Sequence, residues 1–451
     1  MDDVALIWVL TVLLFFVVAF PHWQLLWRWK HTDPFGAVYL ASAYFLLIFP
    51  LRSLYALAQG TEFLGKPPFD EATRTAWVVA LVYLIVGFGV FYLGYYSPLG
   101  RMVARAAPGL PSMWRWRRVG WMAVGLTLIG LMSFILLVKY LGGLETYLTQ
   151  KQVALTAGGT TYLYQLIGSF WIASAICYLR YTQTRARRHL LQTLVLLVTT
   201  LLVGATTGAK GYVFFPLLTI LVLRHYLIRR INVLFIVLIG LILTALIPAF
   251  NIFRHTQDLS TIPTRYMIVI STPRILLHHL LARFHPLDAV VTIIRDTGSL
   301  FPFQYGSTII PIFVAWIPRA IYPDKPVISY AKVFGETYWA EWFAGTGSAP
   351  SVSILGEAYV NFHFPGLVTI AFIAGVLLRG FYDYLVRLRR SHSGLLLYAL
   401  NMPYIAMFWE SDIVGLITRA IFWNLLGILV CLIVARPAWR TENPSRGFAT
   451  G

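Results

Sequence analysis

Eleven long apolar stretches run through this chain of 451 residues, and they constrain its fold more than any other feature. A helix of about 20 apolar residues crosses the hydrocarbon core of a bilayer, and it satisfies its backbone hydrogen bonds internally. The sequence therefore predicts an all-α polytopic membrane protein. The expected spans lie near residues 4–20, 35–57, 76–95, 120–140, 161–179, 190–207, 212–228, 232–252, 364–386, 393–409 and 413–435.

The composition supports this class and excludes several others. Hydrophobic residues make up 58% of the chain and charged residues only 12%, about half of the roughly 25% that is usual in soluble domains. Water-soluble enzymes, disulfide-rich secreted domains and disordered regulators are therefore excluded. The two cysteines, Cys177 and Cys431, both lie in apolar stretches, which argues against a disulfide framework or a cysteine metal site.

The net charge of +18 is distributed unevenly between two alternating sets of connections. One set has 21 Lys and Arg residues against three acids, and the other has 14 basic residues against 15 acids. Positive connections stay on the cytoplasmic side, so we expect a cytoplasmic (inner) membrane protein with its N-terminus outside and its C-terminus in the cytoplasm. The basic excess indicates topology and attraction to anionic membrane lipid, and nucleic acid is not an expected partner. The basic set comprises residues 21–34, 96–119, 180–189, 224–231, 379–393 and the tail from 436.

One connection is far longer than the others. It divides the chain into eight expected spans (1–253), a long outer segment (254–353), three further spans (354–436) and a cytoplasmic tail (437–451). Connections of this length are usually functional. Apolar residues recur at helical spacing over residues 274–295, with His, Arg and Asp between them, and predict a helix lying on the outer membrane surface.

Several cations lie on the outer side, beside a face that is otherwise acidic. Arginine matches phosphate oxygens bidentately and lysine supplies a point charge, so the group suits a lipid diphosphate. For any single arginine, a solvated ion pair or a headgroup anchor is the alternative, and a lysine in a tight turn can simply cap helices. The candidate catalytic cations are Arg254 and Arg319, and the candidate substrate-binding cations are Lys210, Arg265, Arg283 and Lys325.

A second group of candidates directly precedes the ninth expected span. Glu357 is followed by Tyr359, Asn361 and His363. Transfer of a glycosyl group from a lipid diphosphate needs cations that stabilise the leaving diphosphate and a base that accepts the proton of the attacking hydroxyl. Glu357 suits that base, and the neighbouring side chains suit an acceptor sugar.

Two carboxylates, Glu410 and Asp412, lie at the outer turn between the last two spans. Such a pair can hold a divalent metal, but we favour a structural or acceptor-orienting role. The expected site therefore contains no metal and no cofactor.

Two motifs resemble those of a known family. The segment WIPRAIYPDKP (316–326) and the later SVSILGEAYVNF (351–362) resemble the bacterial oligosaccharide repeat-unit polymerases, which are the O-antigen and exopolysaccharide polymerases of the Wzy-dependent pathway. The layout is also similar, with a Gly-Ala-Lys-Gly turn before the seventh span, an arginine after the eighth and a long outer loop. His363 departs from the pattern, because a glycine is expected after Asn361-Phe362.

The resemblance implies a metal-independent enzyme with a C-type glycosyltransferase-like membrane fold. It would transfer a growing chain from its polyprenyl-diphosphate carrier to the next lipid-linked repeat unit, beside a flippase and a chain-length regulator. Carried over by position, Lys210, Arg254, Arg319 and Lys325 would hold diphosphate, and Glu357 would orient or deprotonate the acceptor.

Two other functions remain open at this point. An O-antigen ligase of the same fold would use the same donor with another acceptor. A transporter or lipid-linked-sugar flippase would place ionisable residues at the bilayer midplane and contain broken helices, and Arg419 within the last span suits that alternative.

Overall fold

The computed structural model is helical throughout the part of the chain that it describes, and no strand occurs in these residues. Nine of the described helices are long and apolar enough to cross a membrane. The protein is therefore an all-α, multi-pass membrane protein. The structure describes residues 3–27, 32–59, 70–149, 160–207, 210–255, 259–281, 284–315, 317, 321–326, 329–340, 349–388 and 390–435.

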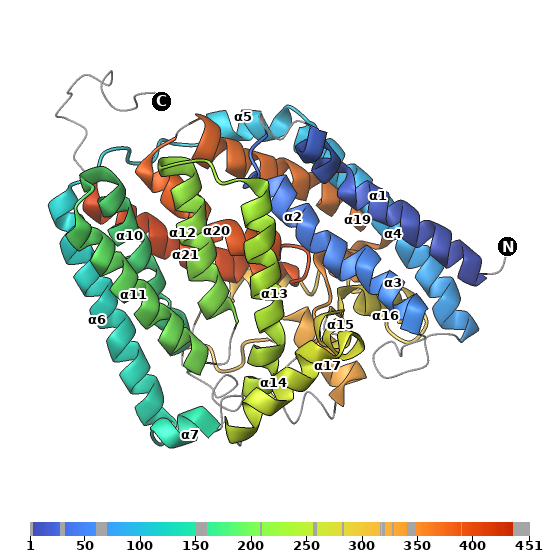
Figure 1. Cartoon of the computed structure of the whole chain (residues 1–451). Helices are drawn as coiled ribbons and strands as arrows, with labels where there is room; N and C mark the ends of the chain where they lie inside the picture. Colours follow the sequence, from blue (N-terminus) through green and yellow to red (C-terminus); the bar gives the residue numbers. More distant parts are fainter. Residues whose placement is uncertain are drawn as a thin grey trace.

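The helices follow in this order (Figure 1). The first half contains α1 (Asp3–Trp27), α2 (Ala37–Leu46), η1 (Leu47–Leu51), α3 (Arg52–Gln59), α4 (Glu71–Tyr96), α5 (Leu99–Ala106), α6 (Trp116–Tyr140), α7 (Leu144–Thr149), α9 (Thr160–Ile167), α10 (Ser169–Thr184), α11 (Arg187–Thr206) and α12 (Gly211–Leu227). The second half contains α13 (Val233–His255), η2 (Leu259–Thr261), α14 (Ile262–Ser271), α15 (Pro273–Leu281), α16 (Pro286–Asp296), η3 (Ile310–Phe313), α17 (Tyr330–Tyr338), α19 (Ile354–Tyr382), η4 (Asp383–Leu388), α20 (His392–Ala406) and α21 (Ile413–Val434).

The expected spans coincide with helices: the second comprises α2, η1 and α3, the fifth comprises α9 and α10, and two other spans consist of a single short helix. α12 has 17 residues and α20 has 15, so neither is among the nine helices of full spanning length. The second span is bent: Pro50 lies in the π-helical turn η1 between α2 and α3. Proline has no amide hydrogen for the helical ladder, and such a wide turn restores the helix beyond it.

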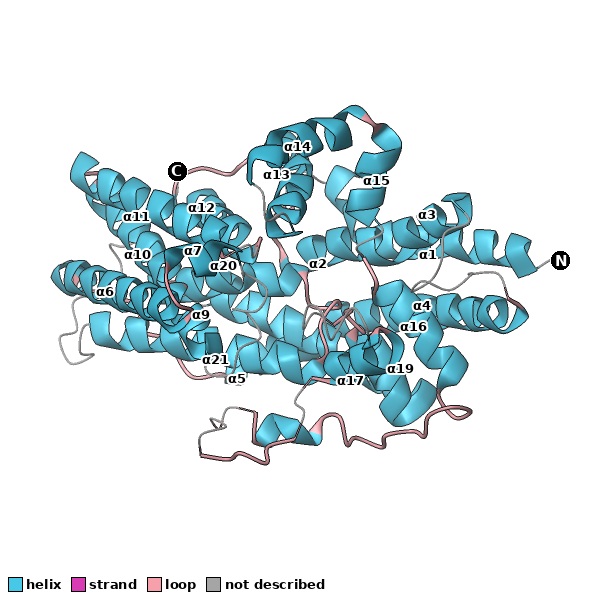
Figure 2. Ribbon diagram, turned by 90° about the horizontal axis from the view of Figure 1, so that it is seen from below, coloured by secondary structure: helices cyan, strands magenta, loops and turns pink. Residues whose placement is uncertain are grey.

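The helices pack in two groups that meet along α2 and α20 (Figure 2). α1, α4, α5, α16 and α19 form one group, and α6, α10, α11, α12, α20 and α21 form the other. α13, α14 and α15 pack mainly against one another. α4 and α19 pack closely, and a Cβ added at Gly375 would lie 2.1 Å from the carbonyl oxygen of Phe91. Small residues of this kind allow membrane helices to approach closely.

The expected surface helix over residues 274–295 is wrong. Pro286 begins a separate helix, α16, which is buried against α4 and α19. Its polar residue Asp288 forms a bidentate ion pair with Arg52, at 3.0 and 2.7 Å, and both side chains are at most 3% exposed. Asp288 therefore faces a buried partner instead of lipid headgroups.

Hydrogen bonds to Asp33 establish which helix ends lie together. His225 near the end of α12 and Tyr382 at the end of α19 both contact this carboxylate. The beginnings of the two helices, at Lys210 and Ile354, therefore lie toward the opposite end of the bundle. Figure 1 shows α14 and α17 of the long segment at that end, and α5 at the other.

Candidate active site

The candidate site begins with a short helical segment at the start of α19. Backbone angles outside the helical range at Phe362 and His363 separate residues Ile354–Asn361 from the rest of the helix. Pro365 explains the break, because proline lacks an amide and restricts the residue before it. At the other end, the Ser353 hydroxyl accepts a hydrogen bond from the amide of Leu355 and caps the segment.

Glu357 lies on this segment, and its carboxylate is completely buried. Oε1 accepts a hydrogen bond from Thr308 Oγ1 at 2.7 Å, and Oε2 accepts one from the backbone amide of Ile413 at 2.6 Å. Ile413 is the first residue of α21, so Glu357 satisfies an amide at a helix N-terminus, where negative charge is favourable. Asp412, at the N-cap position, makes no such bond.

Asn361 completes a polar network around Thr308. Its Nδ2 donates to Thr308 Oγ1 at 2.7 Å and to the carbonyl oxygen of Glu357 at 2.8 Å. Its Oδ1 accepts from the backbone amide of Gly306 at 2.7 Å. The Thr308 hydroxyl thus donates to a carboxylate and accepts from an amide, which leaves one lone pair for a further donor.

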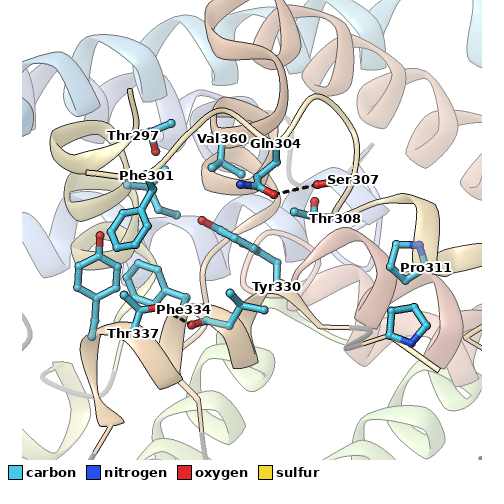
Figure 3. Close-up of a pocket in the computed structure, with 14 residues that line it drawn as sticks. Thr297, Phe301, Gln304, Ser307, Thr308, Pro311, Tyr330, Phe334, Thr337 and Val360 are labelled. Carbon is cyan, nitrogen blue, oxygen red and sulfur yellow. Dashed lines mark hydrogen bonds between the residues drawn. The ribbon is translucent and has the colours of Figure 1, made fainter. Parts of the chain in front are cut away.

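Thr308 lines a cavity of about 240 Å³ between the long segment and α19. Figure 3 shows Thr308 beside Ser307 and Gln304 in one wall, with Tyr330 and Phe334 of α17 in another. The cavity combines apolar rings with a few hydroxyl and amide groups, which is typical of small-molecule sites. Its remaining lining residues are Ile293, Thr297, Phe301, Pro311, Pro326, Val333, Thr337, Tyr338 and Val360.

Charged residues border this cavity. Burial and the nearby Glu357 carboxylate raise the pKa of Tyr330. Tyr338 donates to Asp296 Oδ2 at 2.7 Å, and Arg295 forms a bidentate pair with the same carboxylate. The hydrogen bond to Asp296 raises the pKa of Arg295 further. Burial and the hydrogen bond to Asp296 also raise the pKa of Tyr338, so both tyrosines stay neutral hydroxyl groups at ordinary pH.

The two expected carboxylates after α20 take different roles. Glu410 accepts hydrogen bonds from Tyr44 and, at 3.3 Å, from Ser351, so it joins α2 to the residues before α19. Asp412 is buried near Glu357. Within the described ranges, no three His, Cys, Asp or Glu residues are grouped as a metal site would require.

The described cations differ in their availability. Lys325 Nζ donates to the carbonyl oxygens of Ala315 and Ile317, at 2.6 and 2.8 Å, and so closes its own loop. Lys210 Nζ is buried and has no hydrogen-bond partner among the described residues. Because a buried ammonium without a partner is costly, Lys210 is the cation best suited to receive an anionic group. Arg265 is exposed on α14.

The remaining expected site residues either lie outside the described part of the structure or make no described hydrogen bond to Glu357. Arg283 and Arg319 lie outside the described residues, and Arg254 is described only as part of the α13 backbone. Tyr359 and His363 form a ring pair, with centroids 4.8 Å apart, and both contact Phe303. His363 is exposed and has no hydrogen bond to Glu357 in the described part of the chain.

Sequence reasoning missed Thr308 and the Arg52–Asp288 pair. Nothing in the sequence distinguishes Thr308 from other loop hydroxyls, because its importance comes from a segment about 50 residues away. Arg52 did have a signal, since an ionisable residue within an apolar stretch usually has a specific partner.

Comparison with known proteins yields no relative. No protein-family model matches the chain, and no curated protein or solved structure is significantly similar to it.

Proposed function

We propose that this protein is a membrane glycosyltransferase that joins polyprenyl-diphosphate-linked oligosaccharide repeat units on the outer face of the cytoplasmic membrane. The observation that supports this most is the buried Glu357 carboxylate behind Thr308 in the wall of the cavity. A buried base that reaches the cavity through one hydroxyl suits deprotonation of a sugar hydroxyl.

The proposed reaction uses Thr308 as a relay. The acceptor hydroxyl donates to the free lone pair of Thr308 Oγ1 and attacks the anomeric carbon of the donor sugar. The bond from that carbon to the diphosphate oxygen breaks, and its electron pair leaves with the diphosphate. The acceptor proton passes to Thr308, whose own proton moves to Glu357 across 2.7 Å.

Cations neutralise the leaving diphosphate in this proposal. Lys210 Nζ has no protein partner among the described groups, and it lies at the start of α12, where backbone amides favour an anion. The family resemblance assigns Arg254 and Arg319 to the same task. Lys325 would act by fixing the backbone at Ala315 and Ile317, because its ammonium is bound to their carbonyl oxygens.

Reconstitution tests this function. Purified protein is mixed with a polyprenyl-diphosphate-linked repeat unit extracted from the same organism, and the products are separated on a gel. A ladder with repeat-unit spacing supports the polymerase. Transfer only to a lipid-core acceptor would indicate the ligase, and movement of labelled lipid-linked sugar across a vesicle without any transfer would indicate the transporter.

Variants then test the relay. Thr308→Val removes the hydroxyl and should abolish the ladder, whereas Thr308→Ser keeps it and should retain the ladder. Thr199→Val is the matched control, because Thr199 is a half-buried threonine on α11 whose hydroxyl donates only to the Val195 carbonyl of its own helix in the described structure. Arg319→Ala should also abolish polymer in a folded, membrane-inserted protein. Equal ladders from Thr308→Val and the control would refute the relay.

One observation favours the transporter as a second candidate. The break in α19 at Phe362–His363 is the kind of discontinuous helix that transporters use at substrate sites. The vesicle arm of the reconstitution distinguishes the two functions.

A further inference from the structure

A second and larger cavity lies at the end of the bundle opposite to Glu357. Its volume is about 1190 Å³, and it lies between the α1–α2 connection, the end of α12, and the ends of α19 and η4. Five arginines line it, whereas Asp33 is the only carboxylate among the described lining residues. These arginines are Arg229, Arg230, Arg379, Arg387 and Arg390.

Three side chains hold the Asp33 carboxylate. Tyr226 and Tyr382 donate to Oδ2 at 2.5 and 2.6 Å, and His225 Nε2 lies 3.3 Å from Oδ1. The backbone amide of Ile231 donates to His225 Nδ1 at 3.0 Å, so the proton of a neutral His225 is on Nε2 and points to Asp33. The carboxylate is thus engaged in joining helices.

A second carboxylate lies behind the cavity wall and forms ion pairs with three arginines. Asp383 is 2.8 Å from Arg379, 3.8 Å from Arg387 and 3.9 Å from Arg101. One negative charge shared in this way cannot neutralise all three. Arg229 and Arg390 add further exposed positive charge at the rim. A concave surface of one sign focuses its potential on a ligand of the opposite sign.

The cavity also lies where a lipid headgroup would be. It is at the ends of several membrane helices, and Tyr39, Tyr95 and Tyr96 belong to its walls. Tyrosine rings collect at the headgroup level of a bilayer. Basic residues that only set the membrane topology need not line a common cavity. Here, however, arginines from separate connections line the same cavity.

We propose that this arginine-lined cavity binds a phosphate-bearing anionic group, and that the membrane supplies it as the headgroup of an acidic phospholipid. Arginine forks suit phosphate oxygens, and basic pockets between membrane helices bind such headgroups. The chemistry of a soluble phosphate is the same, so the test must separate the two sources. The inference is independent of the proposed glycosyl transfer.

The test uses the whole protein in nanodiscs of phosphatidylcholine with and without phosphatidylglycerol. Retained phosphatidylglycerol is measured by native mass spectrometry, and binding of inorganic pyrophosphate is titrated in the phosphatidylcholine discs. The variant is Arg229→Gln with Arg390→Gln, two exposed residues outside the Asp383 pairs. The control is Arg187→Gln with Arg188→Gln, which removes the same charge from exposed residues of the basic set that do not line the cavity.

The variant should bind phosphatidylglycerol about 25-fold more weakly, since each of the two arginines near an anionic surface contributes roughly a fivefold factor. The control should bind like the unchanged protein. Pyrophosphate binding that depends on the same arginines, without retention of phosphatidylglycerol, would support the phosphate site and refute the lipid source. Equal behaviour of variant and control with both ligands would overturn the proposal.

Discussion

Ser353 and His363 both adopt positive φ angles, 65° and 53°, and they enclose the helical segment that contains Glu357. Residues with a Cβ rarely adopt such backbone angles. Each costs about 1–3 kcal/mol, so it persists only where surrounding contacts enforce it. The segment is therefore held in place by its surroundings on both sides. Strain of this kind is common where a site needs a fixed geometry.

His363→Gly should raise the free energy of unfolding by about 1 kcal/mol, because glycine adopts this angle without strain. Unfolding of the detergent-solubilised protein by heat measures the change. His363→Ala keeps a Cβ and should show no gain. If both variants gained equally, removal of the imidazole and not relief of the backbone would be responsible.

Glu357→Gln should reduce polymer formation by about 10²–10⁴-fold, the usual contribution of a general base. The amide oxygen can still accept from Ile413, so the protein should remain folded. The initial rate of ladder formation measures the effect. Glu145→Gln on α7, where the side chain is exposed, is the control, and an unchanged rate for Glu357→Gln would exclude it as the base.

Removing one partner of the buried Arg52–Asp288 pair should lower the free energy of unfolding by about 3–5 kcal/mol, because the other charge is left buried. We expect this for Asp288→Ala. Combining Arg52→Met with Asp288→Leu should recover most of the loss, since apolar replacements of similar size often stabilise as well as a buried pair. Additive losses in the double variant would contradict this explanation.

Asp33 should make stability depend on pH. Burial alone would raise its pKa, but hydrogen bonds from His225, Tyr226 and Tyr382 outweigh this effect and lower the pKa. The stabilisation is therefore complete above the unfolded pKa of about 3.9 and is lost as pH falls through the lower folded pKa. Asp33→Asn should cost about 2 kcal/mol at neutral pH, and its difference from the unchanged protein should shrink in acid. A constant difference down to about pH 2 would contradict this ionisation.

Polymer formation should persist in a chelator. Glu410 is engaged by Tyr44 and Ser351, and Asp412 lies beside Glu357 without a third acid in the described structure to form a metal site. The ladder assay in the presence of EDTA measures this. Loss of activity that added magnesium or manganese restores would instead assign a metal to Glu410 and Asp412.

The membrane-spanning architecture follows from the sequence because apolar length alone defines a span. The restart of α19 after residue 363 also agrees with the expected ninth span, since Pro365 restricts the backbone there. The burial of α16 against α4 and α19 could not be predicted in this way. Its spacing is equally compatible with lipid on one face or with protein on every side, and only the position of Arg52 decides between them.

The same reason limits prediction of the site. Glu357 and Asn361 are one helical turn apart, so their proximity follows from the sequence. Thr308 and Ile413 reach Glu357 from segments that are 49 and 56 residues away. No local pattern encodes contacts at that distance. The glycine expected at position 363 falls where the backbone angle is positive, which is the conformation that glycine favours.

The Arg52–Asp288 pair has a consequence for biosynthesis. The two residues are 236 positions apart, so at about 5–20 residues per second the ribosome needs tens of seconds to produce Asp288 after Arg52. During this interval the second span must enter the bilayer with an unpaired guanidinium, which can remain at the water interface. When α16 is added, Asp288 pairs with that guanidinium inside the protein, so α16 joins a bundle whose first helices are already in the membrane.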